Sequence, residues 1–289
     1  MITRSLSGFY TVTPEPPAEA VVCKARGRFR REGTVPLVGD RVVLSVQPDG
    51  TGRLEELLPR TSEFVRPPVA NIDTMVIVGS LAIPRSDTFL LDRVTAVCAH
   101  KGIRAILCFN KQDLAPTDEL TALYRSAGYP VIATSAETGE GLEDLRALLR
   151  GHISAFTGNS GVGKSSLLQK LDPSLHLKVG EVSEKLGRGR HTTRHVELLP
   201  LSGNIWVADT PGFSAFEPGQ MELLARADLE KAFPEFARYR GDCRYRDCLH
   251  VGGETSGCAV LDALTRGEIV PSRYDSYRKL FEQTRPLYS

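Results

Sequence analysis

A glycine-rich stretch near the middle of the chain has the residue types and the spacing that bind a phosphate chain. It fits the pattern G-x-x-x-x-G-K-[ST] and comprises Gly158, Asn159, Ser160, Gly161, Val162, Gly163, Lys164, Ser165 and Ser166. An apolar stretch typical of a buried strand precedes it (152–157), and residues of helical composition follow (166–171). Strand, loop and helix of this kind direct several backbone N–H groups at one anion. We expect Lys164 to reach the outer phosphates of a nucleotide and the Ser165 hydroxyl to ligate Mg²⁺. A chance glycine-rich turn would not need the Lys-Ser pair at this offset.

Two further motifs predict that the bound nucleotide carries guanine. The pattern N-K-x-D is formed by Asn110, Lys111, Gln112 and Asp113 after a predicted strand (104–109). A carboxylate at Asp113 can accept hydrogen bonds from the guanine N1–H and amine, whereas adenine presents another pattern. We expect Asn110 to tie this loop to the phosphate loop and the Lys111 stem to pack over the base. Ser135 and Ala136, after the next predicted strand, resemble the S-A-x loop that meets the same base through backbone N–H groups. The alternative is that Asp113 only caps a helix.

Two segments after the phosphate loop have the residues of nucleotide-responsive switches. Residues 179–195 are polar, basic and glycine-rich without an apolar period, which indicates a loop. A threonine in it could close over Mg²⁺, and we favour Thr193 over Thr192. Asp209 and Gly212 form a D-x-x-G pattern after a predicted strand (204–208). Asp209 is expected to hold the Mg²⁺ shell, and the Gly212 N–H to meet the γ-phosphate. With Lys164 these residues are the predicted catalytic set.

The last part of the chain contains a candidate metal site. Its residues are Cys243, Cys248, His250 and Cys258. Three thiolates and one imidazole make a complete tetrahedral set for structural Zn²⁺, with no position left for catalysis. The alternatives are unligated thiols, or a water as the fourth ligand in place of His250. Helices are predicted around the cluster at 222–232, 259–266 and 273–283. Nearby arginines could bind RNA phosphate or form an ordinary hydrated surface; they are Arg238, Arg240, Arg244 and Arg246.

The elements that must position these motifs alternate between strand and helix. Apolar runs predict buried strands at 72–81, 104–109, 130–135 and 152–157, and helical spacing predicts helices at 88–100, 118–127 and 142–149. This alternation predicts a doubly wound α/β sheet with its ligand at the carboxyl ends of the strands. The expected domains are residues 1–66, 67–218 and 219–289, with a polar connector at 61–68.

The first domain is predicted to be a small β-barrel of the OB type. Short strands are expected at 20–25, 28–30 and 41–46, separated by turn residues. Five basic residues fall within eight positions with Phe29 among them; they are Lys24, Arg26, Arg28, Arg30 and Arg31. On a strand they would share a face suited to RNA phosphates. A solvated basic strand is the alternative.

Composition sets few further bounds. The chain has 289 residues, 41% hydrophobic and 25% charged, and a net charge of +1, which describes an ordinary globular protein of two or three domains. No apolar run approaches the roughly 18 residues of a membrane span. We therefore expect a cytoplasmic protein without membrane partners, a monomer, whose cysteines are not paired in disulfides.

The order of barrel, guanine motifs before the phosphate loop, and a Cys-Cys-His-Cys module resembles the ribosome small subunit-dependent GTPase A family over essentially the whole chain. In Ras-like GTPases N-K-x-D and S-A-x follow the phosphate loop, so the central domain resembles a circularly permuted GTPase. The resemblance implies an OB barrel, a GTPase domain and a mainly helical zinc domain. It also implies slow GTP hydrolysis to GDP, stimulated by the small ribosomal subunit during its late maturation, with rRNA as a binding partner.

The sequence identifies no residue that positions the attacking water, and it allows two rival functions. Phe213 follows the D-x-x-G pattern where Ras-like enzymes have a glutamine that orients water, and residues 214–220 contain no histidine that could replace it. One rival function is an RNA-binding factor whose nucleotide acts only as a clamp. Another is an ATPase or kinase with a fortuitous N-K-x-D motif.

Overall fold

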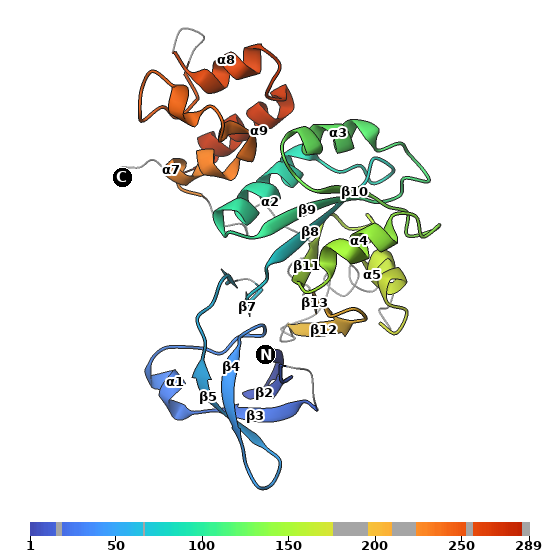
Figure 1. The fold of residues 1–289 in the computed structure, drawn as a ribbon, viewed down its shortest axis with the longest axis vertical. Coiled ribbons are helices and arrows are strands. Elements are labelled where there is room, and N and C mark those ends of the chain that lie inside the picture. Colours follow the sequence, from blue (N-terminus) through green and yellow to red (C-terminus); the bar gives the residue numbers. More distant parts are fainter. Residues whose placement is uncertain (16–18, 66, 176–195, 210–223, 253–256, 285–289) are drawn as a thin grey trace, which may run out of the picture.

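The computed structural model describes residues 1–15, 19–65, 67–175, 196–209, 224–252 and 257–284, with only the backbone of Arg30, Asp209 and Ala227. Its elements form a barrel at the N-terminal end, a central α/β sheet, and a helical module at the C-terminal end (Figure 1). Among the described residues, the model contains no helix with both the length and the apolar character of a membrane span.

The central sheet is doubly wound, as the alternation of strands and helices predicts. The strand order is β10 (Val131–Ala133), β9 (Arg104–Phe109), β8 (Thr74–Gly79), β11 (Ile153–Thr157), β13 (Ile205–Asp209) and β12 (Glu197–Leu201). The first five are parallel, and β12 is antiparallel to β13. The side chains of β8, β9 and β11 are buried on both faces apart from Arg104, which is why these strands are nearly continuous apolar runs in the sequence.

Four helices cover the two faces of this sheet. One face packs against α2 (Thr88–His100) and α3 (Asp118–Ser126), whose apolar side chains join the cluster that contains Met75 and Leu107. The other face packs against α4 (Leu142–Leu149) and α5 (Lys164–Leu171) in a cluster with Val76 and Ile106. Alternate residues of one strand thus serve two cores.

The described part of the N-terminal barrel has five strands, of which the sequence predicts two, at 20–25 and 41–46. The order is β1 (Ile2–Leu6), β2 (Phe9–Val12), β3 (Val21–Ala25), β5 (Gly52–Leu57) and β4 (Val42–Val46). The strand expected at 28–30 is wrong, because Gly27–Arg31 forms the short helix α1. Its basic residues therefore do not alternate along one strand face. Phe29 is buried in the barrel core and does not lie among them on the surface.

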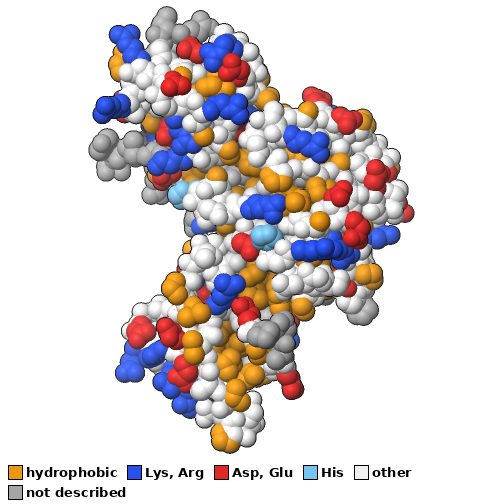
Figure 2. All heavy atoms as spheres, in the orientation of Figure 1, with side chains coloured by type: hydrophobic (Ala, Val, Ile, Leu, Met, Phe, Trp, Pro, Cys, Tyr) orange, Lys and Arg blue, Asp and Glu red, His pale blue; other side chains and the backbone are white. Residues whose placement is uncertain are grey.

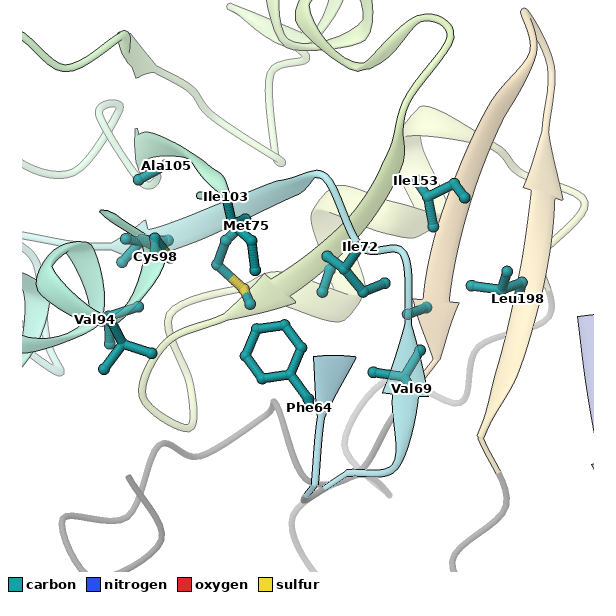
Figure 3. Close-up of a cluster of buried hydrophobic side chains, with 14 of the residues drawn as sticks. Phe64, Val69, Ile72, Met75, Val94, Cys98, Ile103, Ala105, Ile153 and Leu198 are labelled. Carbon is teal, nitrogen blue, oxygen red and sulfur yellow. The ribbon is translucent and has the colours of Figure 1, made fainter. Parts of the chain in front are cut away.

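The connector between barrel and sheet is an ordered, partly buried hairpin. It contains β6 (Glu63–Phe64) and β7 (Val69–Ala70), and the Phe64 and Val69 side chains point toward Ile72 and Met75 (Figure 3). The Asn71 side chain donates to the carbonyl of Gly39 at 2.9 Å. The sheet also continues through this junction, because β1 pairs with β12. Barrel and sheet therefore share one hydrophobic core.

The C-terminal module consists of short helices folded around the cysteine cluster. Its elements are α7 (Arg226–Leu229), η2 (Glu230–Ala232), η3 (Pro234–Phe236), η4 (Arg240–Asp242), α8 (Ala259–Thr265) and α9 (Pro271–Gln283). The helix expected at 222–232 is shorter than predicted, and its last turn is a 3₁₀ helix. The module packs against α2 through a cluster that contains Ala96, Leu229 and Ala232.

Candidate functional site

The phosphate loop and the guanine motif line one cavity at the carboxyl ends of the central strands. Its volume is about 640 Å³, and its walls include Asn110, Asp113, Ala136, Gly163 and Ser166. Asn110 follows β9, Ala136 follows β10, and the phosphate loop follows β11. Because these strands are parallel, three loops far apart in sequence meet at one edge of the sheet. Asp113 is exposed, so its carboxylate is accessible to a ligand.

Asn110 links all three of these loops. Its side chain is buried, and its amide Nδ2 donates to the carbonyl of Val162 at 2.8 Å. Its Oδ1 accepts from the backbone N–H of Ala136 at 3.0 Å and from the Thr134 hydroxyl at 3.3 Å. The side chain therefore uses both its donor and its acceptor. The tie between the N-K-x-D loop and the phosphate loop that the sequence predicts is present, and it extends to the S-A-x loop.

The glycines of the phosphate loop bring its backbone close to its neighbours. Gly158, Gly161 and Gly163 all have positive φ angles, of 144°, 81° and 98°. A Cβ atom at Gly158 would lie 2.1 Å from the carbonyl oxygen of Val78, and one at Gly163 would lie 2.2 Å from Asn110 Nδ2. The loop can therefore pass this close to β8 and to the guanine motif only without side chains at these positions.

Lys164 begins α5 and donates to the carbonyls of its own loop. Its Nζ lies 2.7 Å from the oxygen of Gly158 and 2.9 Å from that of Asn159. Burial lowers the pKa of Lys164 from 10.5 to about 8, because desolvation disfavours the charged form. An anionic ligand in the loop would restore the preference for the ammonium. Ser165 follows in the first turn of α5 and is half-buried.

Of the three predicted switch residues, only Asp209 is among the described residues, and only its backbone is described. Asp209 ends β13, next to the strand that leads into the phosphate loop, and its backbone lies in register with Glu197. Thr193, its alternative Thr192, and Gly212 lie outside the described residues. Their roles on Mg²⁺ and the γ-phosphate stay predictions.

Residues that the sequence motifs did not identify line the cavity or contact the motifs beside it. The Lys111 Nζ donates to the carbonyl of Ile83 at 2.9 Å, and Pro84 packs against Gly161. The loop after β8 thus touches both nucleotide motifs. Gln169 and Pro173 line the cavity from the α5 side. No short pattern identifies such residues, because only the fold brings them to the cavity.

The four predicted metal ligands meet in the C-terminal module. One donor atom from each lies within 4.8 Å of the others. A tetrahedral Zn²⁺ ion, with bonds of about 2.3 Å to sulfur and about 2.0 Å to nitrogen, would separate two sulfurs by about 3.8 Å and sulfur from nitrogen by about 3.5 Å. The Sγ atoms of Cys243 and Cys258 are 4.0 Å apart, and His250 Nδ1 lies 3.6 and 3.4 Å from them. The cluster therefore fits a tetrahedral metal ion.

Burial sets the protonation of two of these groups in the absence of a metal ion. Burial raises the pKa of the Cys258 thiol to about 12, so a thiolate at this position needs a positive charge beside it. Burial lowers the pKa of His250, which keeps the imidazole neutral and able to coordinate. The neutral imidazole is ready to coordinate, whereas the thiol would have to release its proton when a metal ion binds.

The basic residues of the barrel are partly neutralised. Arg26 forms an ion pair with Glu55 at 2.6 Å, and Arg28 donates to the carbonyl of the same residue. Figure 2 shows Lys and Arg side chains gathered over the α1 side of the barrel with acidic side chains among them. Lys24, on β3, lies over the ring of the exposed Phe9 on the neighbouring strand β2.

Comparisons with family models, curated proteins and solved structures all match this chain to one family. The family model described as "RsgA N-terminal domain" matches residues 1–54, and that described as "RsgA GTPase" matches residues 57–218. Two curated relatives, each called "Small ribosomal subunit biogenesis GTPase RsgA", come from Caldanaerobacter subterraneus and Geobacillus thermodenitrificans. They are 42% and 45% identical, over 98% and 99% of this chain and 95% and 98% of their own.

Two solved structures share the fold at nearly full length. YjeQ from Thermotoga maritima aligns with a TM-score of 0.83 and 33% identity over 98% of this chain and 96% of its own. YloQ, described as a circularly permuted GTPase, aligns with a TM-score of 0.81 and 34% identity over 99% of this chain and 96% of its own. Motifs, fold and matched sequence lead to the same conclusion. The chain belongs to the RsgA GTPase family and consists of an OB-type barrel, a circularly permuted GTPase domain and a C-terminal module with a Cys₃His cluster that could hold a metal ion.

Proposed function

We propose that this protein hydrolyses GTP to GDP and phosphate while it assists the late maturation of the small ribosomal subunit. The observation that carries the proposal is the cavity in which Asn110 joins the guanine motif to the phosphate loop. The relatives that match nearly the whole chain have this activity and this role in their name. The protein would act in the cytoplasm, where small subunits are assembled, and would work as a monomer.

The residues of the cavity have separate tasks in this proposal. Asp113 accepts the guanine N–H groups, and the loop Gly158–Ser166 surrounds the phosphates with backbone donors. Lys164 leaves the loop carbonyls and donates to the outer phosphates. Ser165 and Asp209, with Thr193, would hold Mg²⁺, which supplies positive charge as the phosphoryl group is transferred. The Gly212 N–H meets the γ-phosphate.

The proposed domain division is 1–66, 67–218 and 219–289, with a structural Zn²⁺ on the Cys₃His set in the last. The spacing of the sulfur and nitrogen atoms supports zinc. Basic side chains on the barrel and on the C-terminal module suit rRNA phosphates (Figure 2). The barrel and the module would therefore bind the subunit on two sides of the GTPase domain.

Turnover measurements test the proposed activity. GTP hydrolysis is measured with purified small subunits, with large subunits, and with free RNA. Stimulation by small subunits alone supports the proposal. Hydrolysis that no ribosomal particle stimulates would instead favour a nucleotide-gated RNA clamp.

The guanine assignment is tested by replacing one carboxylate. In Asp113→Asn, the side chain keeps its size, but its amide NH₂ can donate a hydrogen bond to the O2 of xanthine, which stands where guanine has its amino group. We expect GTP affinity to fall by at least tenfold and affinity for xanthosine triphosphate to rise, as measured by competition with a fluorescent nucleotide. Asp118→Asn, at the start of α3, is the control and should bind both as the wild type does. Equal affinity of the wild type for ATP and GTP would contradict the assignment.

A further inference from the structure

The candidate metal site has an outer partner that its sequence pattern does not include. Glu230 begins η2, twenty residues before His250 in the chain, and its Oε2 lies 3.0 Å from His250 Nε2. The other ring nitrogen, Nδ1, faces Cys243 and Cys258 at 3.6 and 3.4 Å. The imidazole therefore stands between a carboxylate on one side and the sulfur atoms on the other.

We infer that Glu230 is a positioning residue of the metal site: its carboxylate accepts the Nε2–H of His250 and so directs Nδ1 to the metal. The inference depends on the zinc proposed above. An imidazole has one proton to place, and the carboxylate determines which nitrogen keeps it. A metal-bound histidine that donates to a carboxylate is fixed in orientation and is a stronger ligand.

The surroundings of His250 leave few other orientations for the ring. Its side chain is only 1% exposed, and its backbone has a positive φ of 56°, which a histidine rarely adopts. The Tyr274 hydroxyl donates to the His250 carbonyl at 2.8 Å. The Phe236 ring packs edge-on against the imidazole with centroids 6.0 Å apart. These contacts hold the backbone and the plane of the ring, and Glu230 is the partner that selects the nitrogen.

Glu230 is itself placed by the contact between the C-terminal module and the GTPase domain. Its neighbours Leu229 and Ala232 are buried in the cluster that includes Ala96 of α2. These two anchors fix the backbone of Glu230 at a place from which its side chain reaches the histidine. The metal site and the α2 contact are therefore connected through a single turn of helix.

Zinc affinity of the full-length protein tests the inference. Zinc-loaded wild type, Glu230→Ala, Glu230→Gln and Asp228→Asn are titrated with a colorimetric zinc chelator. We expect Glu230→Ala to bind zinc 10–100-fold more weakly, because the outer partner of the ligand is lost. Glu230→Gln should lose less, because its amide oxygen still accepts from Nε2–H. Asp228 lies in the same segment and pairs with Lys231 on the surface, so Asp228→Asn should match the wild type.

A second measurement needs no substitution. The wild type is labelled with ¹⁵N-histidine, and His250 is identified as the imidazole whose signals change when zinc is removed. Long-range ¹H–¹⁵N spectra should show that this imidazole binds the metal through Nδ1 and carries its proton on Nε2. Zinc on Nε2, or a folded Glu230→Ala with wild-type affinity, would overturn the role of Glu230. A wild type that binds no zinc would overturn the proposed metal site as well, so the two failures are distinguishable.

Discussion

Gly163 shows how closely the two nucleotide motifs approach each other. The hydrogen bond from Asn110 to Val162 brings the amide against the backbone of the next residue, where a Cβ would lie 2.2 Å from Nδ2. The contact that joins the guanine and phosphate loops therefore needs a residue without a side chain. Even the smallest side chain at position 163 would displace Asn110.

Gly163→Ala should accordingly abolish nucleotide binding at concentrations that saturate the wild type. The added methyl displaces Asn110 and separates the loops. Gly128→Ala is the matched control, because Gly128 also has a positive φ but has open space around its Cβ position. Both variants carry backbone strain of about 1–2 kcal/mol, so stability measured by urea unfolding should fall in both. If GDP binding fell equally in both, strain alone would explain the loss.

Lys164 should make nucleotide binding depend on pH. In the free protein its pKa is about 8, and bound phosphates raise it, so the complex carries one more proton above that pH. Affinity for GDP should be constant below about pH 7 and should then fall by up to tenfold per pH unit above about pH 8. Isothermal titration between pH 6.5 and 9.5 measures this. Lys164→Ala should bind GDP weakly at every pH and lose this dependence. Titration of the nucleotide itself affects the wild type and the variant alike, so the difference between them reports Lys164.

Among the elements, α2 has two roles. One side of it covers the central sheet, and the other receives the C-terminal module through a buried ionic network. Arg273 of α9 donates to Asp92 of α2 at 2.6 Å and to Glu235 of η3 at 2.7 Å, and the arginine is 1% exposed. The Tyr124 hydroxyl donates to the same Asp92 carboxylate at 2.8 Å. The module is therefore fixed to a helix of the GTPase domain as well as being connected through the D-x-x-G segment.

Arg273→Ala should destabilise the protein by about 3–5 kcal/mol, because it leaves two buried carboxylates without their cation. The midpoint of urea unfolding measures the loss. Adding Asp92→Asn and Glu235→Gln removes the unpaired charges and should recover part of the stability. Arg266→Ala removes an exposed arginine that pairs with Glu268 on the surface and should leave the midpoint near that of the wild type. A midpoint for Arg273→Ala equal to that of Arg266→Ala would show that the network contributes little.

In the molecule as a whole, the barrel and the C-terminal module are attached to the GTPase domain at different places. The barrel continues the sheet, since β1 pairs with β12 and the connector packs in the same core (Figure 3). The C-terminal module has its own apolar cluster and the metal-ligand set. The nucleotide cavity lies at the carboxyl ends of the central strands, between the N-K-x-D loop and α5.

Zinc removal should therefore disorder the C-terminal module and spare the nucleotide cavity. After dialysis against a strong chelator, we expect loss of helical signal in circular dichroism and loss of stimulation by small subunits. GDP affinity should stay within about threefold of that of the loaded protein, because none of the residues that line the cavity belongs to the module's cluster. Re-addition of Zn²⁺ should restore the signal. A parallel loss of GDP affinity would show that the module also supports the cavity.

The sequence by itself determined the features that depend on local chemistry. The glycine loop with Lys164, the N-K-x-D motif and the Cys₃His set each need particular residue types at fixed spacing, so they are visible without a structure. Buried parallel strands are apolar on both faces, and α2 was predicted at Thr88–His100, where the structure has it. The strand at 28–30 was wrong because alternating basic residues resemble a strand, while burial of Phe29 in the barrel core is satisfied by a short helix.

Only the tertiary structure decided which distant groups act together. Asn110 serves three loops, Glu230 meets His250, and Arg273 meets Asp92 across 181 positions of chain. The connector, polar in sequence, is ordered because its few apolar side chains reach the shared core. These contacts form only after whole elements have packed together. The hydrophobic effect that drives this packing is non-directional, so no short sequence pattern specifies which elements will meet. Local motifs are therefore readable in the chain, whereas the partners that hold them in place are set by the fold.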